Sequence, residues 1–177
     1  MRGVGVYLRG VTLFVAGIVV GTVLMQPRPS RAQENRSAQE KRTGLRLNHV
    51  GIAVNDYDAS LNFYTKVMGY HIAFKFPPSP DGKPTTTYFQ INKDTFLEMA
   101  PASAQVPAGV THMGIETSDI KSTIAQLRAA GGTVEDMRVS GPTKALLSNI
   151  RDPNGIRMEL IELTPDSLHK KAEDSWK

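Results

Sequence analysis

His49-Val-Gly-Ile-Ala-Val-Asn-Asp56 and His112-Met-Gly-Ile-Glu-Thr-Ser-Asp119 are two copies of one pattern, His-x-Gly-Ile-x-x-x-Asp. Each copy places a short β-prone segment before an Asp, a residue type that favours the exit from a strand into a helix. Two copies are too few for a solenoid, so the repeat indicates duplication of one supersecondary unit.

An amphipathic helix pattern follows each copy. The first pattern ends at Gly69, which suits the position after a helix, and Asp58 is its predicted N-cap. The second pattern begins at Ile120 and ends at Gly131. Each half therefore begins with a strand and continues into a helix of about three turns.

The remainder of each half is predicted to be extended, because it is rich in β-branched and aromatic residues between turn residues. The predicted strands cover 71–76, 85–91 and 95–99 in the first half, and 133–138, 144–150 and 156–161 in the second. Each half reads β-α-β-β-β. The sequence thus predicts an α+β fold built from two βαβββ modules.

One glutamate lies on the last predicted strand of each half, Glu98 in the first and Glu159 in the second. Because successive strand residues point to opposite faces, each glutamate points away from its apolar neighbours. By the same alternation, His49 shares a face with Gly51, while Val50 and its apolar partners pack under the helix. Each module therefore contributes one His from its first strand and one Glu from its last.

These four residues predict a metal site. A carboxylate among apolar neighbours is costly unless a cation or metal compensates it. Two glutamates and two neutral imidazoles would balance one divalent ion, and nitrogen and oxygen ligands suit Zn, Ni, Mn, Co or Fe. A single His or Glu at such a position is more often structural, and only the recurrence favours ligation by His49, Glu98, His112 and Glu159.

Two further histidines have no counterpart in the repeat. We expect His71 and His169 to be surface residues. The cluster Tyr88-Phe89-Gln90 is expected to serve core and edge packing rather than substrate contact.

From about Leu47 to Leu163 the chain resembles the vicinal oxygen chelate superfamily, which includes glyoxalase I and the bleomycin resistance proteins. The resemblance is carried by the following segments: 48–54, 63–69, 97–98, 112–115 and 152–159. It implies paired βαβββ modules that form an open, cup-shaped mixed sheet around a metal, with the helices outside. It also implies a homodimer.

Glyoxalase I resembles this chain most in its metal pattern, His-Glu-His-Glu. That resemblance implies proton transfer by a metal-bound glutamate on a small oxygenated substrate, with Glu159 as the first choice of base and Glu98 as the second. Glutathione-dependent lyases of the family carry Arg and Asn where this chain has Ala53 and Ala102. These two differences argue against recognition of glutathione.

The superfamily also includes three other kinds of protein. Methylmalonyl-CoA epimerase resembles the first repeat, but acyl-CoA substrates are not expected outside the cytoplasm. An extradiol dioxygenase would use His49, His112 and Glu159, leaving Glu98 as a surplus ligand, and Asn149 replaces a Tyr typical of those enzymes. A module that sequesters a ligand, as bleomycin-binding relatives do, is the alternative that involves no catalysis.

The ends of the chain differ from the middle. Residues 1–32 have the three parts of a signal peptide: basic residues, an apolar run of about 16 residues, and Ser30-Arg31-Ala32 as a cleavage site. We expect cleavage and export to the periplasm or medium. The alternative is a retained membrane anchor, although the run is short for the roughly 30 Å hydrocarbon core.

The predicted organisation is a signal or anchor at 1–32, a linker at 33–44, the domain at 45–163 and a charged tail at 164–177, helical or frayed. The net charge of +4 comes from the four arginines of 1–32, and the rest carries 17 basic and 17 acidic residues. This balance gives no support for a nucleic-acid partner. We expect a small-molecule substrate.

Overall fold

A computed structural model describes residues 44–177 of the chain. The predicted signal segment and nearly all of the predicted linker lie outside the described residues. Within 44–177, no helix has the length and apolar character needed to cross a membrane.

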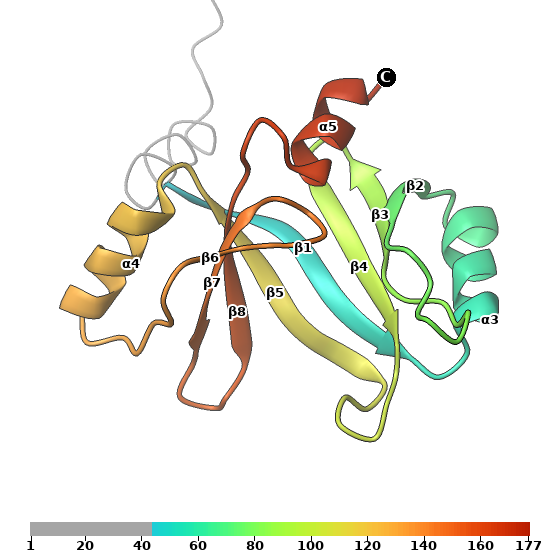
Figure 1. The fold of residues 1–177 in the computed structure, drawn as a ribbon, viewed down its shortest axis with the longest axis horizontal. Coiled ribbons are helices and arrows are strands. Elements are labelled where there is room, and N and C mark those ends of the chain that lie inside the picture. Colours follow the sequence, from blue (N-terminus) through green and yellow to red (C-terminus); the bar gives the residue numbers. More distant parts are fainter. Residues whose placement is uncertain (1–43) are drawn as a thin grey trace, which may run out of the picture. The chain divides into compact units, whose positions relative to one another are not determined.

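The described residues form one eight-stranded mixed sheet with the strand order β2-β3-β4-β1-β5-β8-β7-β6 (Figure 1). Its strands are β1 (Leu45–Val54), β2 (His71–Lys75), β3 (Thr87–Asn92), β4 (Thr95–Pro101), β5 (Gly109–Thr117), β6 (Arg138–Val139), β7 (Leu146–Arg151) and β8 (Arg157–Glu162). The predicted strand at 133–138 is mostly absent, and that stretch contributes only a bridge from Val134 to Ile150 and the short β6.

The two halves of the sheet repeat one topology. In the first module β1 pairs with β4 in parallel, and in the second β5 pairs with β8 in parallel. The two first strands, β1 and β5, then pair with each other in antiparallel fashion at the centre of the sheet. The duplicated α+β fold predicted from the sequence is therefore confirmed.

One helix follows the first strand of each module. The first is α3 (Tyr57–Asn62), which continues as a π-helical turn η1 (Phe63–Val67), and the second is α4 (Ile120–Ala129). The prediction of Asp58 as the N-cap is wrong, because the extended Asp56 accepts the capping hydrogen bond from the Ala59 amide and Asp58 lies in the first turn. Asp119 caps α4 in the same way.

The apolar faces of the strands pack under these helices. Val50, Ile52 and Val54 of β1 lie in one cluster with Leu97 and Met99 of β4 and with residues of α3. A second cluster joins α4 to the second module. The predicted alternation on β1 and β4 is thereby confirmed, and the opposite face of the sheet is left to form the cup.

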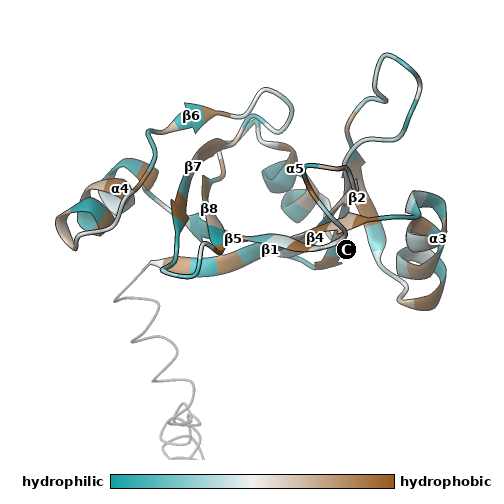
Figure 2. Ribbon diagram, turned by 90° about the horizontal axis from the view of Figure 1, so that it is seen from below, coloured by the Kyte–Doolittle hydropathy of each residue, from teal (hydrophilic) through white to brown (hydrophobic). Residues whose placement is uncertain are grey.

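A third helix, α5 (Leu168–Ser175), follows the last strand and lies on the cup side. Figure 2 shows that the ends of the sheet rise on one side of β1 and β5, with α5 between them and α3 and α4 outside. Ala172 of α5 packs against Tyr88 and Phe96, which face the cup from β3 and β4. The segment predicted as a charged tail therefore covers part of the concave face.

Candidate metal centre

At the centre of the sheet, the histidine of each module sits over the glycine of the other. In the antiparallel pairing of β1 with β5, His49 is opposite Gly114 and Gly51 is opposite His112. A Cβ added to Gly51 would lie 2.1 Å from a ring carbon of His112, and one added to Gly114 would lie 2.1 Å from a ring carbon of His49. The His-x-Gly spacing thus provides the space in which the partner module's imidazole lies.

The two glutamates enter at equivalent positions. Glu98 on β4 is aligned with Gly51 across the parallel pairing, and Glu159 on β8 is aligned with Gly114. Each glycine therefore separates a glutamate of its own module from the histidine of the other. The sheet brings all four predicted site residues to one place within a single chain.

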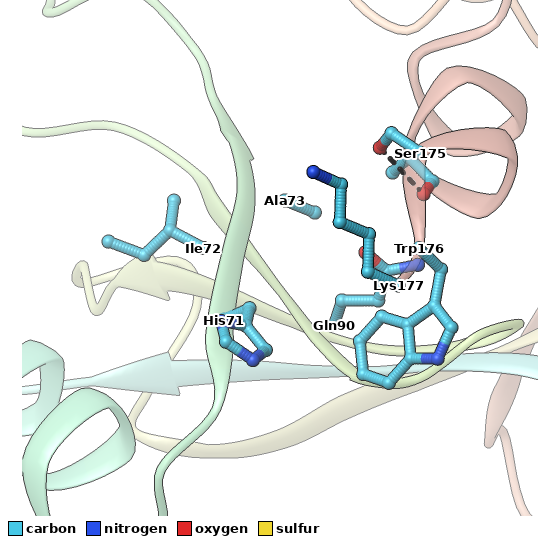
Figure 3. Close-up of a pocket in the computed structure, with 8 residues that line it drawn as sticks. His71, Ile72, Ala73, Gln90, Ser175, Trp176 and Lys177 are labelled. Atoms are coloured by element: carbon cyan, nitrogen blue, oxygen red, sulfur yellow. Dashed lines mark hydrogen bonds between the residues drawn. The ribbon is translucent and has the colours of Figure 1, made fainter.

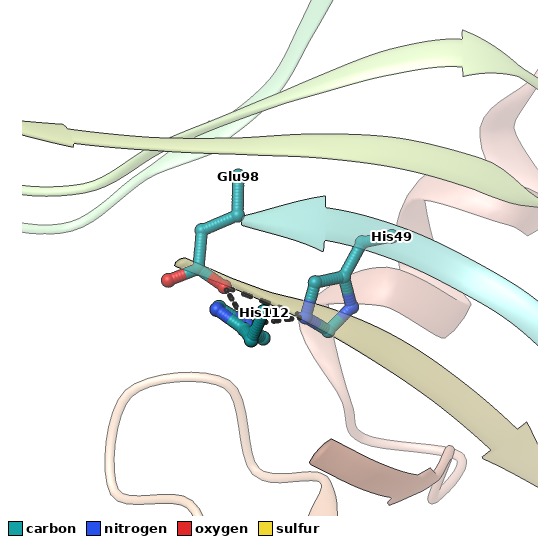
Figure 4. Close-up of side chains that lie close together, drawn as sticks. All are labelled: His49, Glu98 and His112. Atoms are coloured by element: carbon teal, nitrogen blue, oxygen red, sulfur yellow. Dashed lines mark hydrogen bonds and ion pairs between the residues drawn. The ribbon is translucent and has the colours of Figure 1, made fainter. Parts of the chain in front are cut away.

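Three of the four form a compact cluster (Figure 4). The Nε2 atoms of His49 and His112 lie 3.0 Å apart. The Oε2 atom of Glu98 lies 3.4 Å from Nε2 of His49 and 3.2 Å from Nε2 of His112.

These separations fit a shared metal ion. For ligand distances of about 2.1 Å, two ligands at right angles are about 3.0 Å apart, and two at the tetrahedral angle are about 3.4 Å apart. The three observed edges lie within that interval. The donor set, the geometry and the glycine space beneath both rings are therefore consistent with the divalent ion predicted from the sequence.

Glu159 is placed less tightly than the other three. Its Oε1 atom lies 3.8 Å from Nε2 of His49. Its other oxygen, Oε2, lies 3.2 Å from Nη1 of Arg157 and 3.6 Å from Nη2 of Arg138. One side of this carboxylate faces the cluster and the other is held by two cations.

A buried relay fixes the proton on His49. Nδ2 of Asn48 donates to Glu116 at 2.9 Å, and this directs Oδ1 of Asn48 toward Nδ1 of His49, also at 2.9 Å. Since an amide oxygen only accepts, Nδ1 must carry the proton and Nε2 keeps its lone pair for a metal. The ring of His112 has a simpler partner, the hydroxyl of Thr111 at 2.9 Å from its Nδ1.

The environments of the site also separate the pKa values. Burial lowers the pKa of His49 to about 4, against the influence of Glu98, so this imidazole is neutral at pH 7. Burial alone would raise the pKa of Glu98. Its hydrogen bond with His112 and the charge that His49 acquires in acid outweigh burial and lower this pKa to about 2. Burial and the nearby charge of Glu98 raise the pKa of Glu159. The two carboxylates are thus distinct despite their equivalent positions.

Two residues of the site were missed in the sequence. The hydroxyl of Tyr88 donates to Oε2 of Glu98 at 2.7 Å, whereas Phe89 lies in the core. The alternation that placed Glu98 in the cup could have placed Tyr88 there, since the two are directly paired across β3 and β4. The expectation that His169 is a surface residue is wrong: its side chain is buried against the cup, 1% exposed, because α5 folds back over the sheet. His71 is exposed, as expected.

A cavity of about 180 Å³ adjoins the cluster. Both glutamates, Tyr88 and His169 line it, together with apolar and hydroxyl side chains of the second module. A larger cavity of about 290 Å³ lies between β2 and the end of α5, where His71, Gln90 and Trp176 line it (Figure 3). None of the four predicted ligands reaches the larger cavity, so the smaller one is the candidate substrate site.

Known proteins share this sequence pattern. The family described as the Glyoxalase/Bleomycin resistance protein/Dioxygenase superfamily matches residues 46–160. A lactoylglutathione lyase of Arabidopsis thaliana is 29% identical over 135 residues, which are 71% of this chain and 47% of that protein. A probable lactoylglutathione lyase of Vibrio cholerae is 30% identical over 127 residues, 66% of this chain and 90% of the relative. The chain spans about half the length of the plant relative.

Solved structures share the fold. A methylmalonyl-CoA epimerase from Mycobacterium tuberculosis has a TM-score of 0.57 at 22% identity, over 67% of this chain and 88% of that one. A variant of the same enzyme from Streptomyces coelicolor has a TM-score of 0.57 at 20% identity, over 69% of this chain and 96% of that one.

Proposed function

Because the chain belongs to the Glyoxalase/Bleomycin resistance protein/Dioxygenase superfamily, we propose that it is a metal-dependent lyase or isomerase of glyoxalase type. It would act by proton transfer on a small oxygenated substrate. The observation that carries the proposal is the triangle of His49, Glu98 and His112, with Glu159 beside it in the same cavity.

The surroundings of each residue indicate its role in the proposed reaction. His49, Glu98 and His112 would hold the ion, which when bound would polarise substrate oxygens as a Lewis acid. Tyr88 donates to Glu98 and keeps that carboxylate oriented. Glu159 is outside the compact triangle and faces the cavity, so it is the group that takes a proton from substrate carbon and returns it. Arg157 and Arg138 orient Glu159 from the other side.

The geometry does not favour the two alternatives. A dioxygenase triad would consist of His49, His112 and Glu159, yet Glu98 is the carboxylate within ligand distance of both histidines. A module that only sequesters a ligand would not need a complete set of converging donors.

We also propose that the substrate carries no glutathione, although relatives are named lactoylglutathione lyases. Ala53 and Ala102 stand where the family resemblance leads one to expect polar recognition residues. The cavity beside the cluster, of about 180 Å³, matches a small ligand.

Two further parts of the proposal concern the whole chain. Residues 1–32 would direct export, which sequencing the N-terminus of the protein from a periplasmic or culture fraction would test, with Gln33 expected first. A homodimer is also proposed, and light scattering of the purified protein would test it. Neither is required for the four site residues to meet.

Proton transfer can be tested directly in D₂O. Metal-loaded protein is incubated with hemithioacetals, 2-ketoacids and catechols, and incorporation of deuterium at substrate carbon is followed by NMR. For a substrate that exchanges, Glu159→Gln is expected to lower the exchange rate by about 10²–10⁴-fold, the usual contribution of a general base.

The matched control is Asp136→Asn, which removes a carboxylate that is 95% exposed outside the cup. It should leave exchange unchanged. Wild-type protein that binds no Ni, Zn, Mn, Co or Fe, or exchange that survives Glu159→Gln at the full rate, would contradict the mechanism.

A further inference from the structure

We propose that His169 is a substrate-binding residue of the cup and forms a hydrogen bond with an oxygen of the small molecule bound at the metal centre. This inference rests on the proposed function and adds a residue from outside the two modules. The family match ends at residue 160, whereas α5 begins at Leu168.

The surroundings of His169 are apolar and aromatic. Its ring lies 4.8 Å from that of Tyr88, 5.0 Å from that of Phe74 and 5.1 Å from that of Phe96, all edge-on. It is stacked with the ring of His49 at 6.0 Å, which places it directly beside the metal cluster.

Both ring nitrogens of His169 lack a hydrogen-bond partner among the described residues. A neutral imidazole carries one donor and one acceptor, and burying either without a partner destabilises the folded protein. A Phe or Leu would fill the same space without that cost. The polar ring is therefore explained by a partner that arrives with a ligand.

The position of His169 is held from several sides. Ser167 caps α5, and the amide of Leu168 donates to the carbonyl of Thr143 in the second module. Further along the helix, Glu173 forms an ion pair with Arg46 of β1 at 3.4 Å. His169 is thus carried by an element fixed to both modules.

The ligand that forms this hydrogen bond would lie in the cavity beside the cluster. His169 lines the space of about 180 Å³ that Glu98 and Glu159 also line. Both ring nitrogens are buried from solvent, so we infer that the ring turns about χ2 when it presents one of them to a ligand in the cavity. The ligand class is a small molecule with at least two oxygens, one directed to the metal and another to His169.

The test uses Co²⁺-loaded protein and acetohydroxamate, a small chelator with two adjacent oxygens, and follows the visible spectrum of the metal. The variants are His169→Phe, which keeps a ring, and His169→Gln, which restores a donor and an acceptor. The control is His71→Phe on exposed β2. Cobalt affinity and the thermal midpoint are measured for every protein.

Loss of the hydrogen bond is expected to weaken chelator binding about tenfold in His169→Phe, with cobalt affinity unchanged. The thermal midpoint should rise, because two unpaired polar atoms leave the core. His169→Gln should recover most of the affinity, and His71→Phe should match the wild type. If wild type and His169→Phe bind the chelator equally well, the inference about His169 is overturned but the proposed function is not. The same holds if His169→Phe loses affinity only together with a lower thermal midpoint. Absence of cobalt binding in the wild type overturns the proposed function as well.

Discussion

The two modules share a backbone plan and differ in what surrounds their glutamates. Glu98 accepts a hydrogen bond from Tyr88 and lines the same cavity as His169 of α5. Glu159 occupies the equivalent register in the second module but is paired with Arg157 and Arg138. Under the proposed function, duplication supplied a symmetric set of potential metal donors, and the different neighbours would make Glu98 a ligand and Glu159 a base.

The largest effect on metal binding is expected at Gly51 and Gly114, because each glycine makes room for the histidine of the other module. Gly114→Ala would place a methyl group 2.1 Å from the ring of His49, and Gly51→Ala would do the same to His112. Each should abolish measurable metal binding and cost about 1–3 kcal/mol of stability through overpacking. We expect Gly114→Ala to be worse, because Asn48 holds His49 rigidly. Isothermal titration and urea unfolding measure both.

Gly141→Ala is the matched control, since a Cβ added to Gly141 would have no neighbour within 4 Å. If either of the first two variants bound metal as well as Gly141→Ala, the crossed arrangement of histidine and glycine would not matter to the site.

The glutamates should separate in metal affinity. Glu98→Gln removes a donor from the compact triangle and is expected to lower the affinity by more than about 100-fold, beyond the usual effect of losing a supporting partner. Glu159→Gln should lower it by no more than about tenfold, because Glu159 is further from both histidines. Titration with Co²⁺ gives both values, and equal losses would remove the distinction between ligand and base.

Acid should destabilise the metal-free protein through its two buried neutral histidines, His49 and His169. The pKa is lowered by burial to about 4 in His49 and about 3 in His169, from 6.5 in the unfolded chain. The unfolded state therefore binds more protons below pH 6.5, and stability falls as the pH drops toward 4, by on the order of 3 kcal/mol for each group. Urea unfolding between pH 7 and 4 measures the loss.

His169→Phe should lose less stability than the wild type over that interval, because one of the two histidines is gone. A wild-type protein whose stability is flat from pH 7 to 4 would show that these imidazoles are not buried in the neutral form.

The last comparison concerns the groups behind the metal ligands. Asn48→Leu breaks the relay from Glu116 to His49 and is expected to lower metal affinity by about 10–100-fold. Thr111→Val, behind His112, should lower it less, because Asn48 is fully buried and its relay ends in a charge. Asn48→Asp keeps an acceptor for Nδ1 but replaces the donor to Glu116 with a second carboxylate, so it tests the outer half of the relay. The comparison fails if Thr111→Val is the more damaging change.

Much of the site followed from period and repetition. Strand alternation placed His49 and Glu98 on one face and Val50 and Leu97 on the other, because side chains alternate strictly along a strand. The same rule could have placed Tyr88 in the cup. Alternation could not have placed Arg138 beside Glu159, because Arg138 lies on a two-residue strand in a stretch without a clear pattern.

The N-cap of the first helix could not be predicted from the sequence either. Two aspartates stood near the start of the helix, and only the backbone conformation of Asp56 decided which one caps it. The sequence left open whether the charged C-terminal segment is a short helix or a frayed tail. The structure has the helix α5, and the charge of the segment did not predict that Ala172 and His169 face inward from it.

By itself, the sequence determined the module, its duplication and the four converging side chains, since these depend on local periodicity and on a register repeated in both halves. Only the tertiary structure decided that β1 and β5 pair, that each glycine makes room for the other module's histidine, and that α5 brings His169 into the cup. These contacts join residues far apart in the chain, and no local pattern encodes which distant surfaces will meet.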